Sequence, residues 1–308
     1  MPRRNARTAI LMSASILIAA AALPVRGQGR FQAVLDAKLG AAIHGIEAGL
    51  DGVLGLALKD LETGQTLLLN EREVFPQASS IKIALLLEVL KQAEERRLDL
   101  DEYLALETGA KVAGSGILFH LGRPGLKLSV RDTAVLTAVL SDNTATNLLI
   151  DKVGLEAVNR RMDALGLKKT RLRRRMMDVE AAREGRENVS TPLEMMTLLE
   201  KIWRGGVLGE PHRKDLLDVL AIPKDSPLRS GVPEGVEVAE KPGELEAVRC
   251  DSGIVLLPGR PYILCVMTTY LKRDADGNAA IEEVSRTVYG HISRLARSSP
   301  IGRVVSDR

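Results

Sequence analysis

The chain has few aromatic residues and few cysteines. Phe, Trp and Tyr make up 3% of its 308 residues, and cysteine occurs only as Cys250 and Cys265. Two cysteines cannot form the disulfide scaffold of a small secreted domain, and a hydrophobic content of 45% excludes a disordered chain. The composition therefore predicts a globular protein of one large or two modest domains with its own hydrophobic core.

The chain also lacks a large excess of charge of one sign. It has 43 basic and 40 acidic residues, and its net charge is +3. Four basic residues and no acidic residue fall in the first 27 positions, which leaves 39 basic against 40 acidic residues in the rest: Arg3, Arg4, Arg7 and Arg26. A near-neutral body with so few aromatic side chains predicts no nucleic-acid partner.

Residues 1–27 have the pattern of a secretory signal peptide. Three arginines precede an apolar stretch at 9–25, and the residues before Gln28 are small or are tolerated at a signal-peptide cleavage site. We therefore expect a periplasmic or secreted protein with no stable membrane anchor after cleavage. The alternative is an N-terminal membrane anchor, but Ser13 and Ser15 interrupt the apolar stretch, which is short for a membrane span.

The two cysteines are not expected to form a disulfide. Residues 252–257 and 262–269 are strand-like, and the turn-forming sequence Pro-Gly-Arg-Pro joins them. If Leu257 pairs with Tyr262 at the turn, Cys250 and Cys265 lie four residues apart along the ladder. At about 3.3 Å per residue this separation exceeds the reach of a disulfide.

Hydrophobic spacing predicts strands and outer helices at both ends of the chain and helices between them. The expected terminal elements are helix 31–50, strands 53–58, 66–69, 236–239, 252–257 and 262–269, and helix 281–295. Between them we expect helices at 79–98, 130–140 and 193–203, and two helices that end at Gly154 and Gly166.

This order predicts an α/β (α+β) fold, in which both chain ends form an antiparallel sheet flanked by helices and an all-α lobe is inserted. Residues 28–77 and 224–308 would form the α/β domain, and residues 78–223 the all-α domain. We expect a cleft where the two domains meet.

Ser79 and Lys82 are the first pair of residues that could carry chemistry. They are three positions apart at the start of a helix that is apolar nearly all round, so both would meet in a buried setting. A buried lysine tends to lose its proton, and a neutral amine beside a hydroxyl is a base beside a nucleophile. Alternatively, Ser79 or Ser80 merely caps the helix and Lys82 extends to water.

Ser141, Asp142 and Asn143 form a polar tripeptide between two helical stretches. In the functional interpretation Ser141 passes a proton to a leaving nitrogen, Asn143 holds Lys82 and a substrate amide, and Asp142 fixes the turn. The alternative is an ordinary turn with a helix cap.

Lys241-Pro242-Gly243 follows the expected strand 236–239. A lysine and a glycine that allows close approach of the backbone suit a strand that lines a cleft. Metal and cofactor chemistry is not expected, because the four histidines are scattered and no dinucleotide or phosphate-binding motif is found.

The order Ser-x-x-Lys, Ser-Asp-Asn, Lys-x-Gly resembles the class A serine β-lactamase family and its penicillin-binding D-Ala-D-Ala peptidase relatives. Further segments resemble the same family, so nearly all of the chain after the signal peptide is covered: 113–118, 126–132, 170–172 and 191–192. The chain is thereby identified as a divergent member with a β-lactamase/transpeptidase-like fold.

The resemblance implies a role for each residue. Ser79 would be the acylated nucleophile, Lys82 its base and Ser141 the proton shuttle. The substrate-binding residues implied are Asn143, Lys241, Gly243 and Glu244. Lys241 would attract the substrate carboxylate, and the N–H groups of Ser79 and Glu244 would form the oxyanion hole.

Pro242 departs from the family pattern, which has Thr or Ser at this place to bind the β-lactam carboxylate. Proline offers neither hydroxyl nor N–H, so we expect a carboxylate substrate to be bound more weakly or differently. Arg249 is a candidate substitute.

Met176 is the second departure, because the family has there the glutamate that activates water to release the acyl group. Counting back from 191–192 gives Arg175 instead, and neither residue can be a general base. Asp178 and Glu180 are the nearest carboxylates, and the alternative is that both only stabilise the loop. The nearby basic cluster, 168–175, is expected to be solvated or paired with carboxylates.

We therefore expect a monomeric serine hydrolase without a cofactor that opens β-lactams through an acyl-enzyme, with slow release of the product. A D-Ala-D-Ala peptidase, esterase or amidase acting on a peptidoglycan-like substrate is the alternative enzyme. A hypothesis of another class is a non-catalytic, penicillin-recognising sensor or scaffold, for which Lys82 would be displaced or the cleft filled.

Overall fold

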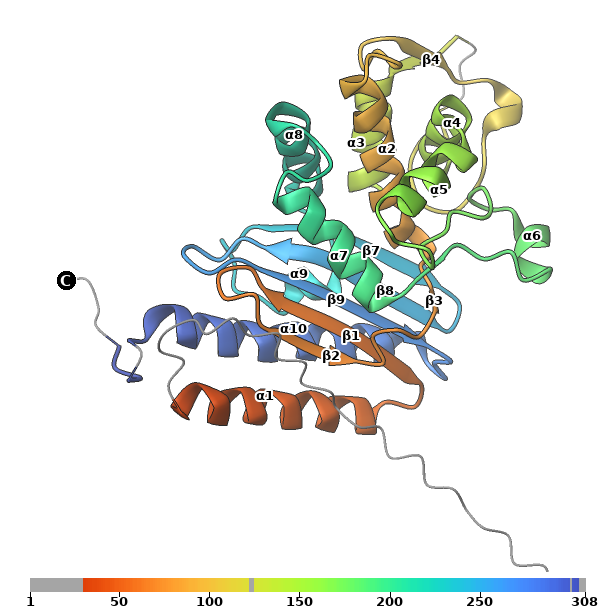
Figure 1. The fold of residues 1–308 in the computed structure, drawn as a ribbon. Helices are drawn as coiled ribbons and strands as arrows, with labels where there is room; N and C mark the ends of the chain where they lie inside the picture. The colour runs from red at the N-terminus through yellow and green to blue at the C-terminus, as the bar shows by residue number, and fades with distance from the viewer. Residues whose placement is uncertain (1–29, 122–124, 300, 305–308) are drawn as a thin grey trace, which may run out of the picture.

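The computed structural model describes residues 30–121, 125–299 and 301–304, and the predicted signal peptide lies outside these ranges. Its main sheet is antiparallel, with the strand order β2-β1-β9-β8-β7 (Figure 1). The strands are β1 (Val53–Asp60), β2 (Thr66–Leu69), β7 (Val238–Leu245), β8 (Val248–Val255) and β9 (Tyr262–Thr269). The predicted antiparallel sheet from both chain ends is therefore confirmed.

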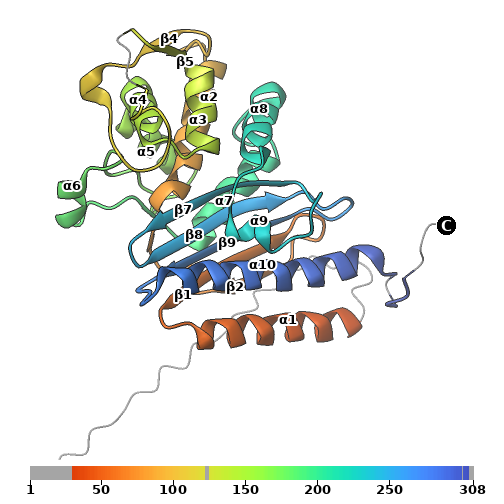
Figure 2. The same cartoon turned by 180° about the vertical axis from the view of Figure 1, so that it is seen from behind.

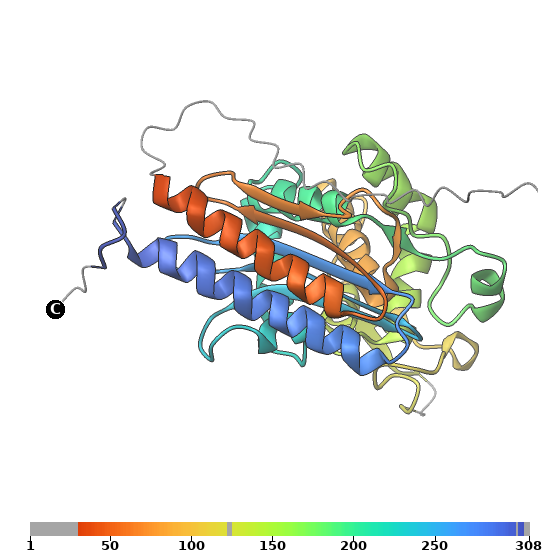
Figure 3. The same ribbon diagram turned by 90° about the horizontal axis from the view of Figure 1, so that it is seen from below.

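Two long helices from opposite ends of the chain cover one face of this sheet. Helices α1 (Arg30–Gly49) and α10 (Asp274–Arg297) lie side by side beneath the strands (Figure 3). Ile43 of α1 and Val284 of α10 are buried in one core with Leu56 of β1 and Leu264 of β9. Within the described ranges, no helix is long and apolar enough to span a membrane.

Helices from the middle of the chain cover the other face. Helix α7 (Pro192–Trp203) packs against β1 and β9, and α8 (Glu210–Ala221) packs against β7 (Figure 2). The sequence analysis did not identify α8, because only Leu216, Leu220 and Ala221 of this polar helix are buried. The division into two domains at 77/78 and 223/224 remains a prediction.

The predicted helix 79–98 divides into two elements. Residues Ala78–Ile81 form a 3₁₀ turn, η1, and α2 (Lys82–Glu94) continues from it. Nearly every residue of α2 up to Leu90 is buried, as its apolar sequence predicted. The helix ends earlier than expected because Arg96 adopts a left-handed conformation with φ of 55°.

The other predicted helices of the middle segment are present. They are α3 (Val130–Val139), α4 (Asn143–Val153) and α5 (Leu155–Ala164), and the Ser129 side chain accepts the N–H of Asp132 at the start of α3, as expected. The short elements are β3 (Phe75–Pro76), η2 (Thr108–Ala110), α6 (Val179–Arg183), α9 (Pro227–Ser230) and the strands β4 (Tyr103–Ala105), β5 (Lys127–Ser129) and β6 (Val189–Ser190).

Both cysteines are free and buried, so the predicted absence of a disulfide is confirmed. The register on which that prediction rested was wrong. Val255, not Leu257, pairs with Tyr262, and the hairpin loop is therefore two residues longer than expected. Leu256 leaves the ladder because its N–H donates to the carbonyl of Glu237 at 2.9 Å. As a result, the thiols lie two residues apart along the ladder rather than four.

Gly55 of β1 allows β3 and α7 to approach the sheet. A Cβ atom there would lie 2.5 Å from the Phe75 ring and 2.9 Å from Pro192. We expect Gly55→Ala to lower the free energy of unfolding by about 1–3 kcal/mol, because a packed core tolerates added volume poorly. Urea unfolding measures this value.

Gly45→Ala is the matched control, because Gly45 lies within α1 with nothing near its Cβ position. It should raise the free energy of unfolding by up to about 1 kcal/mol, since alanine favours a helix. Equal effects of the two substitutions would contradict the packing that we describe at Gly55.

Candidate active site

Ser79 lies in the η1 turn, where the chain enters α2 from the sheet. Ser80 is buried and its hydroxyl donates to the carbonyl of Lys241 at 2.7 Å, whereas Ser79 is only partly buried. Within residues 30–121 and 125–299 the Ser79 hydroxyl makes no hydrogen bond. The 3₁₀ geometry brings residues three apart into line, so Ser79 and Lys82 share one side of the turn. Of the two adjacent serines, Ser79 is the one accessible to a substrate.

Lys82 is fully buried at the start of α2. Its Nζ donates to the carbonyl of Ser141 at 2.7 Å, to Ser141 Oγ at 3.0 Å and to Asn143 Oδ1 at 3.2 Å. Burial and the charge of Lys241 lower the pKa of Lys82 well below 10.5, against the opposing effect of Asp142. The alternative in which Lys82 extends to water is therefore wrong, and the amine can act as a base.

The turn that carries Ser141 is held from two sides. Ser141 has a left-handed φ of 52°, and Asp142 caps α4 by accepting the N–H of Ala145 at 2.9 Å. The second oxygen of Asp142 accepts the N–H groups of Ile117 and Leu118 at 2.6 and 2.8 Å. Asp142 thus fixes the turn, as the sequence predicted.

The segment 113–118 packs around this turn and anchors it through hydrogen bonds. Asn143 donates through its N–H to Ser115 O at 3.0 Å and through Nδ2 to Ala113 O at 3.2 Å. A Cβ atom on Gly116 would lie 2.2 Å from the Asp142 carboxylate. The glycine is therefore needed for the close approach that sets the position of Asn143 Oδ1 and, through it, of Lys82.

Lys241 reaches the same hydroxyl from the sheet. Its Nζ donates to Ser141 Oγ at 3.0 Å and to the Pro242 carbonyl at 3.1 Å. Burial lowers the pKa of Lys241 to about 8, while Glu240 and Asp251 act in the opposite direction. Ser141 Oγ therefore lies between two buried lysines, an arrangement that can pass a proton in either direction.

Strand β7 extends further than the sequence predicted. It starts at Val238 and runs through residues 241–243 to Leu245, so these residues lie within the strand and not after it. Proline is tolerated there because β7 is an edge strand of the sheet. A Cβ atom on Gly243 would lie 2.5 Å from Gln77 O and 2.9 Å from Ser80 N. Gly243 thus lets β7 pack directly against η1, and Glu244 follows it with an exposed side chain.

Arg249 is engaged away from this edge. Its guanidinium donates to the carbonyls of Leu245 and Val248, both at 2.7 Å, and contacts Asp274 at 3.1 Å. These contacts stabilise the hairpin between β7 and β8. The expectation that Arg249 replaces the missing hydroxyl at Pro242 has no support in this geometry.

The basic cluster at 168–175 shows both expected outcomes, because three of its six basic side chains pair with carboxylates and the other three are exposed: Lys168, Lys169 and Arg173. Arg174 is buried and makes two hydrogen bonds of 3.0 Å with Glu187. Arg171 pairs with Asp163, and Arg175 with Asp151. These pairs stabilise the loop between α5 and β6.

Met176 is buried in this loop and is held by its backbone. Its N–H donates to Asn147 Oδ1 at 2.8 Å, and Asn147 Nδ2 donates to its carbonyl at 3.1 Å. The sequence analysis missed Asn147, a buried polar residue of α4 whose partner lies 29 positions away. A lone asparagine within a helix gives no signal of such a partner.

The two candidate bases, Asp178 and Glu180, lie at the exposed start of α6. Asp178 accepts the N–H of Ala181 at 3.0 Å and so caps this helix. Within the described ranges, no hydrogen bond or ion pair links either carboxylate to Ser79, Lys82 or Ser141. The geometry brings the first three catalytic candidates and the Lys241 strand together, and it leaves these two apart.

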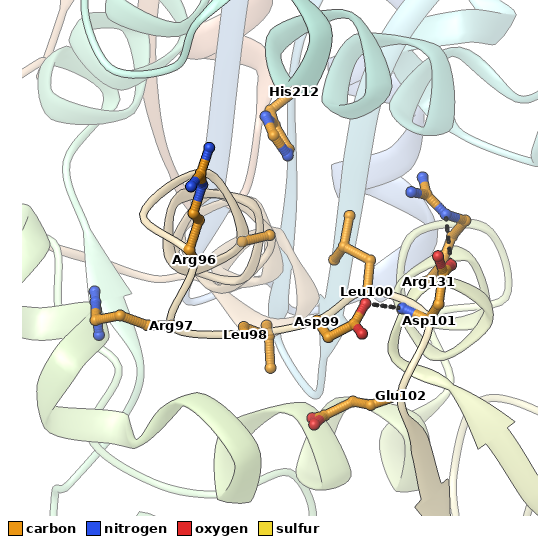
Figure 4. A pocket seen from close by; sticks show the side chains of 10 residues that line it. Arg96, Arg97, Leu98, Asp99, Leu100, Asp101, Glu102, Arg131 and His212 are labelled. Carbon is orange, nitrogen blue, oxygen red and sulfur yellow. Dashed lines mark hydrogen bonds and ion pairs between the residues drawn. The ribbon is translucent and has the colours of Figure 1, made fainter.

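A separate hollow of about 480 Å³ opens at the far end of α2 (Figure 4). Its walls carry charges of both signs, and Arg131 contacts Asp101 at 3.9 Å and Asp215 at 3.4 Å. The thirteen residues of α2, or about 20 Å of helix, separate it from Ser79. Across the described residues, no three acidic, histidine or cysteine side chains converge as metal ligands would.

The chain is similar in sequence to a known protein family and to its characterised members. The model of the β-lactamase enzyme family matches residues 38–292. The chain is 29% identical to β-lactamase L2 of Stenotrophomonas maltophilia, over 94% of this chain and 97% of the relative.

Two solved structures are also similar. The β-lactamase of Sphaerobacter thermophilus superposes with a TM-score of 0.75 at 30% identity, covering 83% of this chain and 97% of that one. A Leu-to-Glu mutant of PBP-A, in an acyl-enzyme complex with penicillin G, superposes with a TM-score of 0.76 at 29% identity. The match covers 82% of this chain and 96% of that one.

The buried amine of Lys82 should leave a trace in the pH dependence of stability. Its native pKa lies below the 10.5 of an ordinary lysine, so between the two values the unfolded chain binds more protons than the folded one. The free energy of unfolding therefore rises with pH in this window, by up to about 1.4 kcal/mol per unit.

We expect Lys82→Met to reduce this slope in urea unfolding between pH 7 and pH 9. The exposed Lys168, changed to Met, is the control and should leave the slope as it is. An unchanged slope in the Lys82 variant would mean that this amine is not neutral in the folded protein.

Proposed function

Because this chain belongs to the β-lactamase enzyme family, we propose that it is an exported enzyme that opens β-lactam amides through an acyl-enzyme on Ser79. At the coarser level, it is a serine β-lactamase-like hydrolase acting on cyclic amides. The observation that carries the proposal is Ser141 Oγ, 3.0 Å from the Nζ atoms of both Lys82 and Lys241 beside the accessible Ser79.

The proposed acylation uses these groups in order. Neutral Lys82 takes the proton of Ser79, whose Oγ attacks the amide carbon. The N–H groups of Ser79 and Glu244 hold the resulting oxyanion. Ser141 gives its proton to the departing nitrogen and recovers one from Lys82, so the C–N bond breaks as the ester forms. Asn143 orients Lys82 and the substrate amide.

Lys241 would attract the substrate carboxylate, as long as it carries its proton. With a pKa of about 8, it is mostly protonated at neutral pH and loses its charge above that value. Because Pro242 supplies no hydroxyl, the carboxylate has one donor fewer than in the family pattern. We therefore expect weak binding of anionic β-lactams.

Slow deacylation is the second expected property. By the two counts the family's glutamate position falls on Met176 or Arg175, neither of which is a general base, while Asp178 caps α6 and Glu180 is exposed. A D-Ala-D-Ala peptidase, esterase or amidase that retains penicillin is the alternative, and the similarity to PBP-A favours it. The hypothesis of another class is a non-catalytic sensor, in which Lys82 is displaced from Ser79; among the described residues Lys82 Nζ bonds Ser141 and Asn143 and not Ser79. We propose a monomer, located in the periplasm or secreted, that needs no cofactor.

Mass spectrometry with benzylpenicillin tests the acyl-enzyme. We expect the mass of the protein to increase by that of one penicillin molecule, and Ser79→Ala to abolish this adduct, because the other hydroxyl at Lys82, that of Ser141, is held between two lysines. Ser80→Ala should keep it, since Ser80 only bonds the Lys241 carbonyl. No adduct on the wild-type chain would refute every acyl-enzyme mechanism.

Met176→Glu tests the cause of slow release. The Asn147 clamp acts on the backbone of residue 176, and we expect it to hold the loop although the Met176 side chain is buried in the core. The adduct should disappear about 100-fold faster or more, the scale of an added general base. Met176→Gln has the same size without a carboxylate and should not accelerate release. If it does, loop mobility and not base catalysis limits the rate.

The remaining carboxylates need their own variants. If Asp178→Asn or Glu180→Gln prolongs the lifetime of the wild-type adduct, that residue is the base. If both variants release the acyl group at the wild-type rate, neither carboxylate takes part.

A further inference from the structure

We propose that Glu240 and Asp251, a buried acidic pair behind the active site, are positioning residues that keep Lys241 cationic toward the substrate carboxylate. This inference rests on the proposed function of Lys241. It assigns a role to a charged cluster on the opposite side of the sheet, none of whose members touches the substrate.

The sheet geometry places the pair directly behind Lys241. Glu240 precedes Lys241 in β7, so the two side chains project to opposite faces. Gly253 pairs with Glu240, and a Cβ atom there would lie 2.5 Å from the Glu240 Cβ. Asp251 pairs with Pro242, one diagonal step away on the same face as Glu240. Both carboxyl groups are buried.

The pair has cationic partners, but they do not satisfy it. Arg229 Nε contacts Glu240 Oε1 at 3.1 Å, and Lys224 Nζ lies 3.4 Å from Glu240 Oε2. Asp251 accepts from Ser226 Oγ at 2.7 Å and from the N–H of Leu228 at 3.1 Å, both on one oxygen.

Among the described residues Asp251 Oδ1 has no hydrogen-bond partner, and Glu240 Oε2 has only the 3.4 Å ion pair with Lys224. Burial of a carboxylate with an unpaired oxygen costs stability, and a purely structural site gains nothing from it. Because the protein keeps this pair despite its cost in stability, we infer that the pair has a role that compensates for the cost.

The charges around Lys241 indicate what that role is. From the active-site side Lys82 approaches the same Ser141 hydroxyl, and from behind Lys224 lowers the pKa of Lys241. Glu240, Asp251 and, more weakly, Cys250 raise it. Without the acidic pair, a buried lysine among other cations would lose its proton near neutral pH.

Glu240 itself changes charge in the relevant range. Burial and the charge of Asp251 raise the pKa of Glu240 to about 7, against the opposing effects of Lys224 and Arg229. Below that value Glu240 is mostly neutral and Lys241 is protonated without its help. Above it Glu240 is an anion, in the interval where Lys241, with a pKa of about 8, begins to lose its proton. The pair therefore extends the cationic state of Lys241 toward alkaline pH.

The test compares acylation by benzylpenicillin and by its methyl ester, which lacks the carboxylate, from pH 6 to pH 9 by quenched-flow mass spectrometry. For Glu240→Gln we expect the benzylpenicillin rate to stay within about twofold of wild type at pH 6. At pH 9 it should fall about tenfold, the effect of one pKa unit. The methyl ester rate should follow the wild-type profile throughout.

Glu237→Gln is the matched control, because Glu237 is an exposed acid just before β7. Glu237→Gln should leave the pH profile of the acylation rate unchanged for both substrates. Asp251→Asn is the second variant and is expected to shift the benzylpenicillin profile in the same direction, so that poor folding of one variant does not prevent the test.

The inference is overturned if Glu240→Gln slows both substrates equally, or slows benzylpenicillin by the same factor at every pH, since either result describes a merely structural residue. If the wild-type chain forms no adduct with either substrate, the proposed function fails instead. NMR titration of the labelled Lys241 Nζ then still tests the inference, because the midpoint should be lower in the variant than in wild type.

Discussion

Two lysines buried around one hydroxyl are the constraint on which this active site depends. Lys82 and Lys241 both lie 3.0 Å from Ser141 Oγ, and burial favours the loss of a proton from each. Such a group of cations holds together only if rigid elements fix every member. The η1 turn, the Ser141 turn and strand β7 supply this rigidity, each through buried backbone contacts. The site therefore lies where the helices meet the sheet edge.

The sequence predicted the meeting of Ser79, Lys82, Ser141 and Lys241, because each lies in a short motif with local spacing and family resemblance. It did not predict the length of β7, since Glu-Lys-Pro is unfavourable in a strand and only the edge position makes it acceptable. The acidic pair was not predicted either, because a glutamate beside a lysine resembles ordinary surface charge. Its burial depends on α9 and on the pairing of β7 with β8 at Gly253, tertiary contacts that the local sequence does not indicate.

The loop between α5 and β6 is anchored mainly by groups other than the side chain that would carry the chemistry. Arg174 binds Glu187, and Asn147 binds the backbone of residue 176. The Met176 side chain adds to this anchoring, because it is buried in the hydrophobic core. A methionine at this position therefore contributes packing where the family pattern has a base.

The pairing of β1 with β9 has a consequence for the order in which the chain assembles. Val53 pairs with Thr269, so the central part of the sheet joins residues from opposite ends of the described chain. Contacts of such long sequence separation form late and slow the folding of a domain. Synthesis must be almost complete before β1 can pair with β9, whereas the hairpin of β7 and β8 closes locally between Leu245 and Val248. Lys241 lies on this hairpin and Ser79 follows the N-terminal strands, so the two parts of the site meet only when the sheet closes.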